Sequence, residues 1–514
     1  MKKNTLRMLI PATLVTLGTT AVSCTGLFEE INRPGGALTK EELMKDNFIG
    51  ESYIRDMMVV AFPKEENQYQ RTMDFNGNHN ARYTTNANDK FNGQLIATMN
   101  ASDGWNAWVY QNSWPVISRN YKSLVDNAGK GSIMELWGSI IRAHAILLYT
   151  DTYGPFPIGT EEDPTAFVSQ EEVYRQLISE LNRVNEALVP ILRANPTLTL
   201  AASADPAYGG DISKWLRFAN SLRLRIALRI SKVAPEEARA LAEQAIQAGV
   251  ITDNADNMKT AYDPAGHYKT SVEWGDSRVS ADLISYLQGL NDPRLAKMIA
   301  KGTNSGDYYG ILLGTAIGAK TKADGIYSAP VFAQNEPLVW LSAAEVSFLK
   351  AEGALLGWDM GNTPKHFYEE GIRLSFAQWK ADGVDAYLSN SNSKPANHAE
   401  PDGGYGRSMA AASDITVMWN DSDNPARKLE RIITQKWLAV YPNGMEAWSE
   451  LRRTGYPKVF PLAEATPGYT LNIANRVPYP TDEQIKNPKG YETMLSLLGG
   501  TNRYDNRMWW QGAN

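Results

Sequence analysis

The chain contains a single cysteine, Cys24, at a position where its thiol could carry a lipid. An uncharged, largely apolar run over residues 8–17 follows a short basic stub, and the small residues Ala21 and Ser23 come just before the cysteine. A basic n-region, a short apolar h-region and small residues before a cut are typical of a secretory signal peptide. The cysteine that follows adds the pattern of a bacterial lipobox. In such a site the thiol is alkylated by a diacylglyceryl group and becomes the first residue of the mature protein.

The alternative is an ordinary secreted protein with one free thiol. Secreted chains usually hold cysteines in even numbers, so the lone Cys24 favours the lipoprotein. The departure from the pattern is Ala21, where such sites usually have leucine. We predict a lipoprotein signal peptide over residues 1–23 and a lipidated tether over 24–37. Two or more acyl chains, palmitate among them, would hold Cys24 at a membrane stably, whereas one chain binds only marginally.

A second group of residues suits ligand binding. Trp105, Trp108 and Trp114 lie within ten residues of one another. The polar residues among them or beside them are Asn100, Asp103, Asn106, Gln111 and Asn112. A flat indole face offers a sugar ring or an apolar side chain a rigid platform, and nearby amides can orient hydroxyls or peptide groups. The alternative is that Trp105 and Trp108 share one helical face and fill the core. The further ligand-binding candidates, taken from polar segments, are Tyr83, Tyr308 and Tyr309.

The search for catalytic signatures gives mostly negative results. The five histidines form no HExxH motif and no pair at short ligand spacing. There is no Walker A loop, no G-x-G-x-x-G and no G-x-S-x-G elbow. Asp421 and Asp423 resemble half a calcium loop, but the glycine and glutamate of an EF-hand are missing, which favours a solvated turn. We therefore expect no catalysis, no cofactor and no metal. Paired carboxylates for glycoside hydrolysis stay open, because 57 acidic residues offer many distant pairs.

Charge argues against a nucleic-acid partner. Residues 1–23 contain three basic residues and no acidic ones, so cleavage would change the net charge from −6 to −9. Binding to nucleic acid needs a basic surface. Four arginines nevertheless crowd one segment: Arg217, Arg223, Arg225 and Arg229. They could form a phosphate-binding surface, or their stems could pack along a helix seam with their heads paired to carboxylates. The acidic composition favours the second interpretation.

The elements that must position these residues are mostly helical. A capping signature with flanking apolar residues occurs three times, at Thr39-x-x-Glu42, Ser169-x-x-Glu172 and Ser342-x-x-Glu345. In such a box the hydroxyl accepts from a free amide while the glutamate reaches back to the cap. Helix starts are thus predicted at 39, 169 and 342, and Thr481-x-x-Gln484 is a less complete version. Apolar residues spaced by three and four predict helix bodies over 133–147, 173–191, 215–226, 348–355 and 429–440.

Long polar segments separate these helices. They cover 62–106, 258–280, 301–337 and 386–426 and are rich in Asn, Gly, Asp and Tyr. Loops of this length are usually functional or disordered, and their aromatic residues argue against disorder. After the signal region, no segment reaches the ~20 apolar residues of a membrane span. We therefore expect a soluble domain over 38–514 that is anchored only at its N-terminus.

Short sequence blocks in a fixed order carry a resemblance to a known family. They are FEEIN (28–32), DTYGPFPI (151–158), KWLRFANSLRLRIALRIS (214–231), LNDPRLAKMI (290–299), WLSAAEVSFLKAEGALLGW (340–358), YEEGIRLSFAQW (368–379), ITQKWLAVYPNGMEAWSELRRTGYP (433–457), RVPYP (476–480) and NRMWWQ (506–511). Together they resemble the SusD/RagB nutrient-binding outer-membrane lipoproteins of Gram-negative anaerobes. The resemblance covers nearly the whole mature chain. Each block is weak alone, and their order and spacing are specific.

The resemblance implies a mainly α, SusD-like fold. It consists of four tetratricopeptide-like helix pairs with few short strands, and long irregular loops gather into a binding face. The resemblance also implies a non-catalytic protein on the extracellular face of the outer membrane. Such a protein would bind an oligosaccharide or a peptide and act as a lid on a SusC-like TonB-dependent transporter. The ligand residues do not transfer, since they lie in variable loops.

Three functions are therefore compatible with the sequence. The first is a binding lipoprotein that delivers a nutrient to a transporter. The second is a lipid-anchored hydrolase that acts on the same polymers. The third is a structural subunit of the transporter that binds no ligand.

Overall fold

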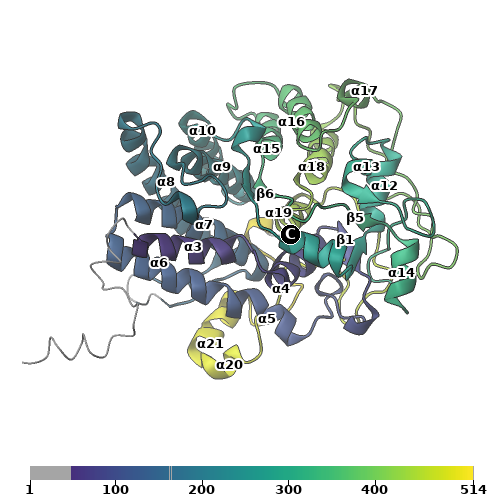
Figure 1. Cartoon of the computed structure of the whole chain (residues 1–514), viewed down its shortest axis with the longest axis horizontal. Coiled ribbons are helices and arrows are strands. Elements are labelled where there is room, and N and C mark those ends of the chain that lie inside the picture. The colour runs from purple at the N-terminus through teal and green to yellow at the C-terminus, as the bar shows by residue number, and fades with distance from the viewer. Residues whose placement is uncertain (1–47, 161–162, 164, 513–514) are drawn as a thin grey trace, which may run out of the picture. The chain divides into compact units, whose positions relative to one another are not determined.

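The computed structural model describes residues 48–160, 163 and 165–512 (Figure 1). The predicted signal peptide, the predicted lipidation site Cys24, the predicted tether and the helix start predicted at Thr39 lie outside the described residues. The chain divides near residue 48 into two units, Met1–Phe48 and Ile49–Asn514. In the part of the chain that the structure describes, no helix is long and apolar enough to cross a membrane.

Long helices that pack in consecutive pairs form the scaffold. The pairs are α7 (Ile133–Tyr153) with α8 (Gln170–Ala194), α9 (Ile212–Ile230) with α10 (Pro235–Ala248), α15 (Ala343–Leu355) with α16 (Pro364–Gln378), and α18 (Pro425–Val440) with α19 (Gly444–Thr454). The pairs also contact one another, α8 against α9, α9 against α15, and α15 against α18. The mainly α fold is thereby confirmed, and every predicted helix body in the described region lies inside one of these helices.

The helix starts show where local signals hold and where they fail. The hydroxyls of Ser169 and Ser342 each accept a hydrogen bond from the backbone N–H three residues on, at 3.1 Å. The expected return contact is absent at both described caps: the Glu172 carboxylate accepts from Gln176, at 2.9 Å, and the Glu345 carboxylate binds Arg225 of α9, at 2.8 Å. The start predicted at Thr481 is also wrong. Helix α20 begins at Glu483, and Thr481 bonds to the Asp103 carboxylate.

Shorter elements complete the unit. The remaining α-helices are α3 (Phe48–Ala61), α4 (Glu66–Tyr69), α5 (Asp103–Asn112), α6 (Trp114–Ala128), α11 (Gly266–Tyr268), α12 (Ala281–Gly289), α13 (Leu295–Met298), α14 (Lys320–Ile326), α17 (Val384–Leu388), α20 (Glu483–Lys486) and α21 (Pro488–Leu497). The segments Gln70–Asn78 and Lys269–Glu273 are π-helical. Much of the polar sequence predicted as loop is therefore built from short helical turns.

Three two-stranded antiparallel sheets tie these segments together. They are β1 (Thr84–Asn86) with β3 (Ser277–Val279), β2 (Met258–Thr260) with β6 (Leu338–Leu341), and β4 (Ile299–Ala300) with β5 (Ala329–Pro330). In the first sheet Thr84 lies opposite Val279. Figure 1 shows α7–α10 at one end of this unit and α12–α14 with β1 and β5 at the other. The irregular segments are thus gathered at one end.

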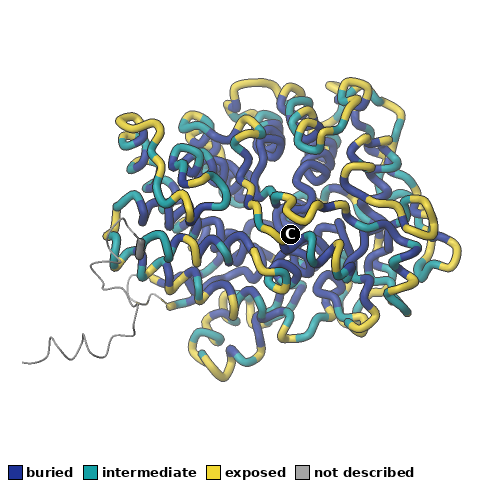
Figure 2. The backbone as a smooth tube through the Cα atoms, in the orientation of Figure 1, coloured by how far each residue is buried: buried dark blue, intermediate teal, exposed yellow. Residues whose placement is uncertain are grey.

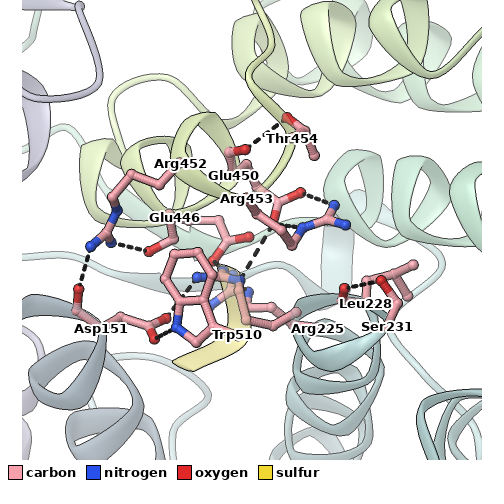
Figure 3. Close-up of polar contacts among 12 residues, drawn as sticks. Asp151, Arg225, Leu228, Ser231, Glu446, Glu450, Arg452, Arg453, Thr454 and Trp510 are labelled. Carbon is pink, nitrogen blue, oxygen red and sulfur yellow. Dashed lines mark hydrogen bonds and ion pairs between the residues drawn. The ribbon is translucent and has the colours of Figure 1, made fainter. Parts of the chain in front are cut away.

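The helix pairs are buried along much of their length (Figure 2), and the buried residues include charged side chains as well as apolar ones. We call the following ten residues the buried ion network: Asp151, Arg225, Arg229, Glu345, Glu352, Lys436, Glu446, Glu450, Arg452 and Arg453. Figure 3 labels six of them, Asp151, Arg225, Glu446, Glu450, Arg452 and Arg453. Five are acidic and five are basic, so the network is neutral overall. Buried charges persist only when they are paired and hydrogen-bonded, and this balance meets that requirement.

The network settles what the arginines do. Arg229 binds Asp151 at 2.7 Å and Glu446 at 2.6 Å. Arg453 binds Glu352 at 2.6 Å, and Arg452 donates to the backbone carbonyl of Asp151 at 2.8 Å. Arg217 is paired to Asp256 and Arg225 to Glu345, whereas the buried Arg223 donates to the side-chain amide oxygens of Asn220 and Gln244. The structure thus confirms pairing with carboxylates along helix seams for Arg217, Arg225 and Arg229, and Arg223 binds amides instead.

Candidate ligand-binding site

A cavity of about 520 Å³ opens between three segments that are far apart in the sequence, 85–100, 314–317 and 464–467. We call it the loop cavity. Its lining residues are Thr85, Asn86, Asn88, Asp89, Asn92, Gly93, Leu95, Thr98, Asn100, Gly314, Thr315, Ala316, Ile317, Glu464, Ala465, Thr466 and Pro467. The volume falls within the ~300–1,000 Å³ of small-molecule sites.

Backbone hydrogen bonds bring the three segments together. Strand β1 leads into the first segment and is held by β3. The backbone N–H of Ile311 donates to the carbonyl of Val279 at 2.9 Å, and that of Ala281 donates to the Ile311 carbonyl at 2.8 Å, so the second segment starts beside the same strand. The N–H of Ala463 then donates to the carbonyl of Leu313 at 2.8 Å, which places the third segment.

One carboxylate fixes the turn that follows β1. Asp276 accepts from the amide of Asn88 and the ammonium of Lys320, both at 2.8 Å, and its backbone carbonyl accepts from the N–H of Ala87 at 2.8 Å. Beneath it the buried Asp74 accepts from the hydroxyls of Thr84 at 2.9 Å and Ser277 at 2.6 Å. These contacts involve charged groups and largely exclude water, so they hold the first wall of the cavity firmly.

A glycine permits the close approach of the second and third walls. Gly314 has a φ of +87°, a conformation that side chains rarely adopt. A Cβ at this position would lie 3.1 Å from the backbone oxygen of Glu464. The same two walls meet the first one where the Thr466 hydroxyl donates to the carbonyl of Thr98. The geometry of the cavity therefore depends on a residue without a side chain.

The lining chemistry is that of hydrogen bonding. Amides, hydroxyls and two carboxylates make up ten of the lining side chains, while aromatic rings are absent from the lining. Such groups match ligands rich in hydroxyls or amides. The hydroxyl oxygen of Thr315 is buried and has no hydrogen-bond partner among the described residues. Buried polar atoms are nearly always satisfied, so this hydroxyl is an unpaired exception in the cavity wall.

The described residues give no support for a metal centre. They contain no group of three or more His, Cys, Asp or Glu side chains that could hold an ion. Asp421 accepts from the indole of Trp419 at 2.8 Å, and Asp423 binds Arg431 at 2.7 Å. The two carboxylates that resembled half a calcium loop thus stabilise a turn.

The six aromatic candidates do not line the loop cavity. Tyr83 is fully buried, and its hydroxyl donates to the backbone carbonyl of Trp437. Trp114 is 8% exposed and packs edge-on against Phe156, with 5.2 Å between the ring centroids. Both are core residues, which corrects the prediction that they contact a ligand.

The other two tryptophans are half-buried on α5. The Trp105 ring lies 5.2 Å from the ring of Phe91 and 4.6 Å from that of Phe75. Because Phe91 belongs to the turn between the lining residues Asp89 and Asn92, Trp105 supports the first wall from behind. The guanidinium of Arg71 covers one face of Trp108 at 4.0 Å from the ring centroid. The interpretation of these rings as ligand contacts stays a prediction.

The two tyrosines lie near the second wall. Tyr309 packs against a small apolar cluster that includes Ala87 and Ile311, together with the lining residue Ile317. Tyr308 is half-buried, with the Lys301 ammonium 5.2 Å from its ring centroid. Like Trp105, Tyr309 borders the cavity wall and does not form its surface, whereas Tyr308 packs against the main core. They also stay candidates.

The lining amides are what the sequence reasoning missed. Asn100 stood among the polar neighbours of the tryptophans, and the segment 62–106 was singled out for its asparagines. Nothing in 464–467 indicated a binding role. Its place in the site follows from a backbone contact between Ala463 and Leu313, which are 150 residues apart.

Comparisons with known proteins agree on one family. The family model described as "SusD-like: Susd and RagB outer membrane lipoprotein" matches residues 30–511. A SusD homologue from Bacteroides uniformis has a TM-score of 0.83 and 34% identity, covering 91% of this chain and 100% of its own. A chitin-binding SusD homologue from Flavobacterium johnsoniae has a TM-score of 0.85 and 31% identity, and the match covers 91% of this chain and 99% of the homologue. One from Bacteroides thetaiotaomicron has a TM-score of 0.83 and 31% identity, covering 90% and 99%. A search of curated proteins gives no match.

Proposed function

The chain belongs to the SusD/RagB family of outer-membrane lipoproteins, and from this premise we propose that it captures an oligosaccharide in the loop cavity without chemically changing it. The observation that carries the proposal is the cavity itself. It has the volume of a ligand site, ten polar side chains and an unpartnered buried hydroxyl. Amides and carboxylates of this kind recognise sugar hydroxyls, each of which both donates and accepts.

Two further observations support a saccharide. A similar protein from Flavobacterium johnsoniae is described as chitin-binding. The cavity also offers few apolar side chains. A peptide with large hydrophobic residues would require more of them. Specific polar groups set orientation and selectivity in such sites. A peptide remains the second candidate ligand, and the experiment below includes it.

The place of the protein in the cell is part of the proposal. Acyl chains on Cys24 would hold it at the extracellular face of the outer membrane, and a SusC-like TonB-dependent transporter would receive the ligand. The family resemblance supports both points. A pull-down from gently extracted outer membranes should recover a β-barrel protein with this chain. Recovery of no barrel would count against the partnership and favour an independent binding protein.

Calorimetric titration of the purified protein with oligosaccharides and peptides tests the binding site. Asn92 lines the cavity, is exposed and has a φ of +52°. Asn92→Gly therefore removes an amide at no conformational cost. We expect an affinity loss of about fivefold, corresponding to ~1 kcal/mol for one hydrogen bond. Asn291 has the same φ and is also exposed but lies outside the cavity, so Asn291→Gly should bind as the unchanged protein does.

Product analysis on the same samples separates binding from hydrolysis. The alternative hydrolase would need a pair of carboxylates, and Asp89 and Glu464 both line the cavity. Prolonged incubation should leave every oligosaccharide intact. New reducing ends that disappear in Asp89→Asn or Glu464→Gln would establish the hydrolase instead. Absence of any bound ligand across the panel would favour the structural subunit.

A further inference from the structure

The charge of the loop cavity has a definite sign. Of its seventeen lining residues two are acidic, Asp89 and Glu464, and none is lysine, arginine or histidine. Both acidic residues are exposed to solvent in this structure, so they present their charge to whatever enters. The described part of the chain contains no ion pair to either carboxylate. The site is therefore net negative and carries no cation of its own.

Lys90 follows Asp89 in the first segment, is exposed and does not line the cavity. Three cations on neighbouring segments are engaged elsewhere. The Lys320 ammonium binds Asp276 at 2.8 Å and the backbone carbonyl of Trp274. The Lys322 ammonium lies 4.8 Å from the ring centroid of Tyr405. Beyond the third wall, Arg503 binds Asp505 at 2.9 Å and stacks on Tyr469. None of these three residues lines the cavity.

This arrangement treats acidic and non-acidic ligands differently. Proteins recognise carboxylate and sulfate groups with arginine or lysine, because charge-assisted hydrogen bonds offset the cost of removing the anion from water. An acidic sugar in the loop cavity would pay that cost beside two like charges. The hydroxyls of a neutral sugar can donate to Asp89, Glu464 and the lining amides. The protonated amine of an amino sugar would gain further attraction.

We infer that the loop cavity selects saccharides without acidic groups, either neutral or amine-bearing, and rejects uronate- and sulfate-bearing glycans. The inference rests on the proposed function, since it names the ligand class for the same site. It adds a property that the oligosaccharide proposal leaves open. The two carboxylates carry the selection, and the amides and hydroxyls carry the affinity shared by all sugars.

A glycan array tests this selection directly. The array should carry glucose, glucosamine and glucuronate oligomers of equal length, with other backbones in the same three charge forms. We expect the purified protein to bind at least one neutral or amine-bearing backbone. The acidic form of that backbone should bind at least tenfold more weakly at low ionic strength. The difference in affinity between the two forms should become smaller as added salt screens the charges.

Variants assign the selection to the two carboxylates. The double variant Asp89→Asn, Glu464→Gln should reduce the discrimination against the acidic form at least fivefold and weaken binding of the amine-bearing form. Asp89→Asn keeps the oxygen that accepts from the backbone N–H of Lys320 at 3.0 Å. Glu492→Gln removes an exposed carboxylate of α21 outside the cavity. It should change neither the discrimination against the acidic form nor the affinity for the amine-bearing form.

Each outcome is decisive. Acidic oligomers that bind as tightly as neutral ones, through a site weakened by Asn92→Gly, would overturn the inference and leave the proposed function standing. Discrimination that persists unchanged in the double variant would also overturn it. A protein that binds peptides and no saccharide contradicts the proposed function and this inference together. If the double variant does not fold, the comparison on the unchanged protein still decides.

Discussion

At the scale of single residues, two threonines of the loop cavity separate binding from folding. The Thr466 hydroxyl donates to the backbone carbonyl of Thr98, whereas that of Thr315 has no partner in the described structure. A hydroxyl bonded within the protein contributes to stability, while a buried unpaired one costs free energy. Replacement by the similarly shaped valine should therefore affect the two positions in opposite ways.

We predict that Thr315→Val leaves the melting temperature unchanged or raises it and lowers oligosaccharide affinity about fivefold, the effect of one lost hydrogen bond. Thr466→Val should instead lower the free energy of unfolding by about 1 kcal/mol. Thermal melts and calorimetric titrations on both variants check this. A Thr315→Val protein that binds at full strength would show that the hydroxyl holds only a water.

Single residues also show the limit of sequence reasoning about the site. The tryptophans and tyrosines were chosen because their rings suit ligands, but exposure decides whether a ring can serve. Tyr83 is covered by contacts with Trp437 and Tyr441, more than 350 residues away. The lining asparagines have no spacing pattern that marks them. Only the three-dimensional fold shows which of the many polar side chains line the same cavity.

At the scale of elements, the helices follow from local signals and their junctions do not. Caps at Ser169 and Ser342 and apolar stripes depend on residues three and four apart, so the sequence reveals them. The partner of Glu345 is Arg225, 120 residues away. The capping pattern could not predict that this glutamate would leave the cap and enter the buried ion network.

The network makes Glu446 a costly carboxylate to neutralise. Burial acts to raise the pKa of Glu446, but Arg229, Lys436 and Arg225 outweigh it and hold that pKa below its usual value. Glu446→Gln would leave these cations short of one negative charge. We predict a loss of about 3–5 kcal/mol in the free energy of unfolding, as for other broken buried pairs. Urea denaturation measures it.

The pH dependence and a surface control sharpen this prediction. A carboxylate whose pKa is lowered on folding stabilises the protein above its unfolded pKa, and this contribution disappears as the pH falls through the folded pKa. The loss in the free energy of unfolding caused by Glu446→Gln should therefore become smaller in acid, below about pH 4.5. Asp126→Asn, at the exposed pair with Lys122, should cost at most about 0.5 kcal/mol. Equal losses in the two variants would contradict the role of the network.

At the scale of the whole molecule, the proposed anchor and the proposed binding site lie in separate parts of the chain. The loop cavity is built entirely from residues of the unit that begins at Ile49. We predict that Cys24→Ser releases the protein from the membrane fraction and abolishes labelling by radioactive palmitate, with the oligosaccharide affinity unchanged. Equal labelling of both proteins would contradict lipidation at this residue.

The order of the short sequence blocks along the chain predicted the fold, because proteins that share a fold have their helices and turns in the same order. The loop cavity could not be predicted in the same way. It depends on three segments that meet through individual backbone contacts, such as Ala463 with Leu313. These contacts leave no periodic trace in the sequence.

The most direct test of the central claim is to locate the backbone amides that a bound oligosaccharide protects from hydrogen exchange. Hydrogen–deuterium exchange on the purified protein, with and without the best-binding oligosaccharide, should show slower exchange in peptides that cover 85–100, 314–317 and 464–467. Peptides from α10 should exchange as before. Protection confined to another surface, with these three segments unchanged at saturating ligand, would contradict the assignment of the loop cavity as the binding site.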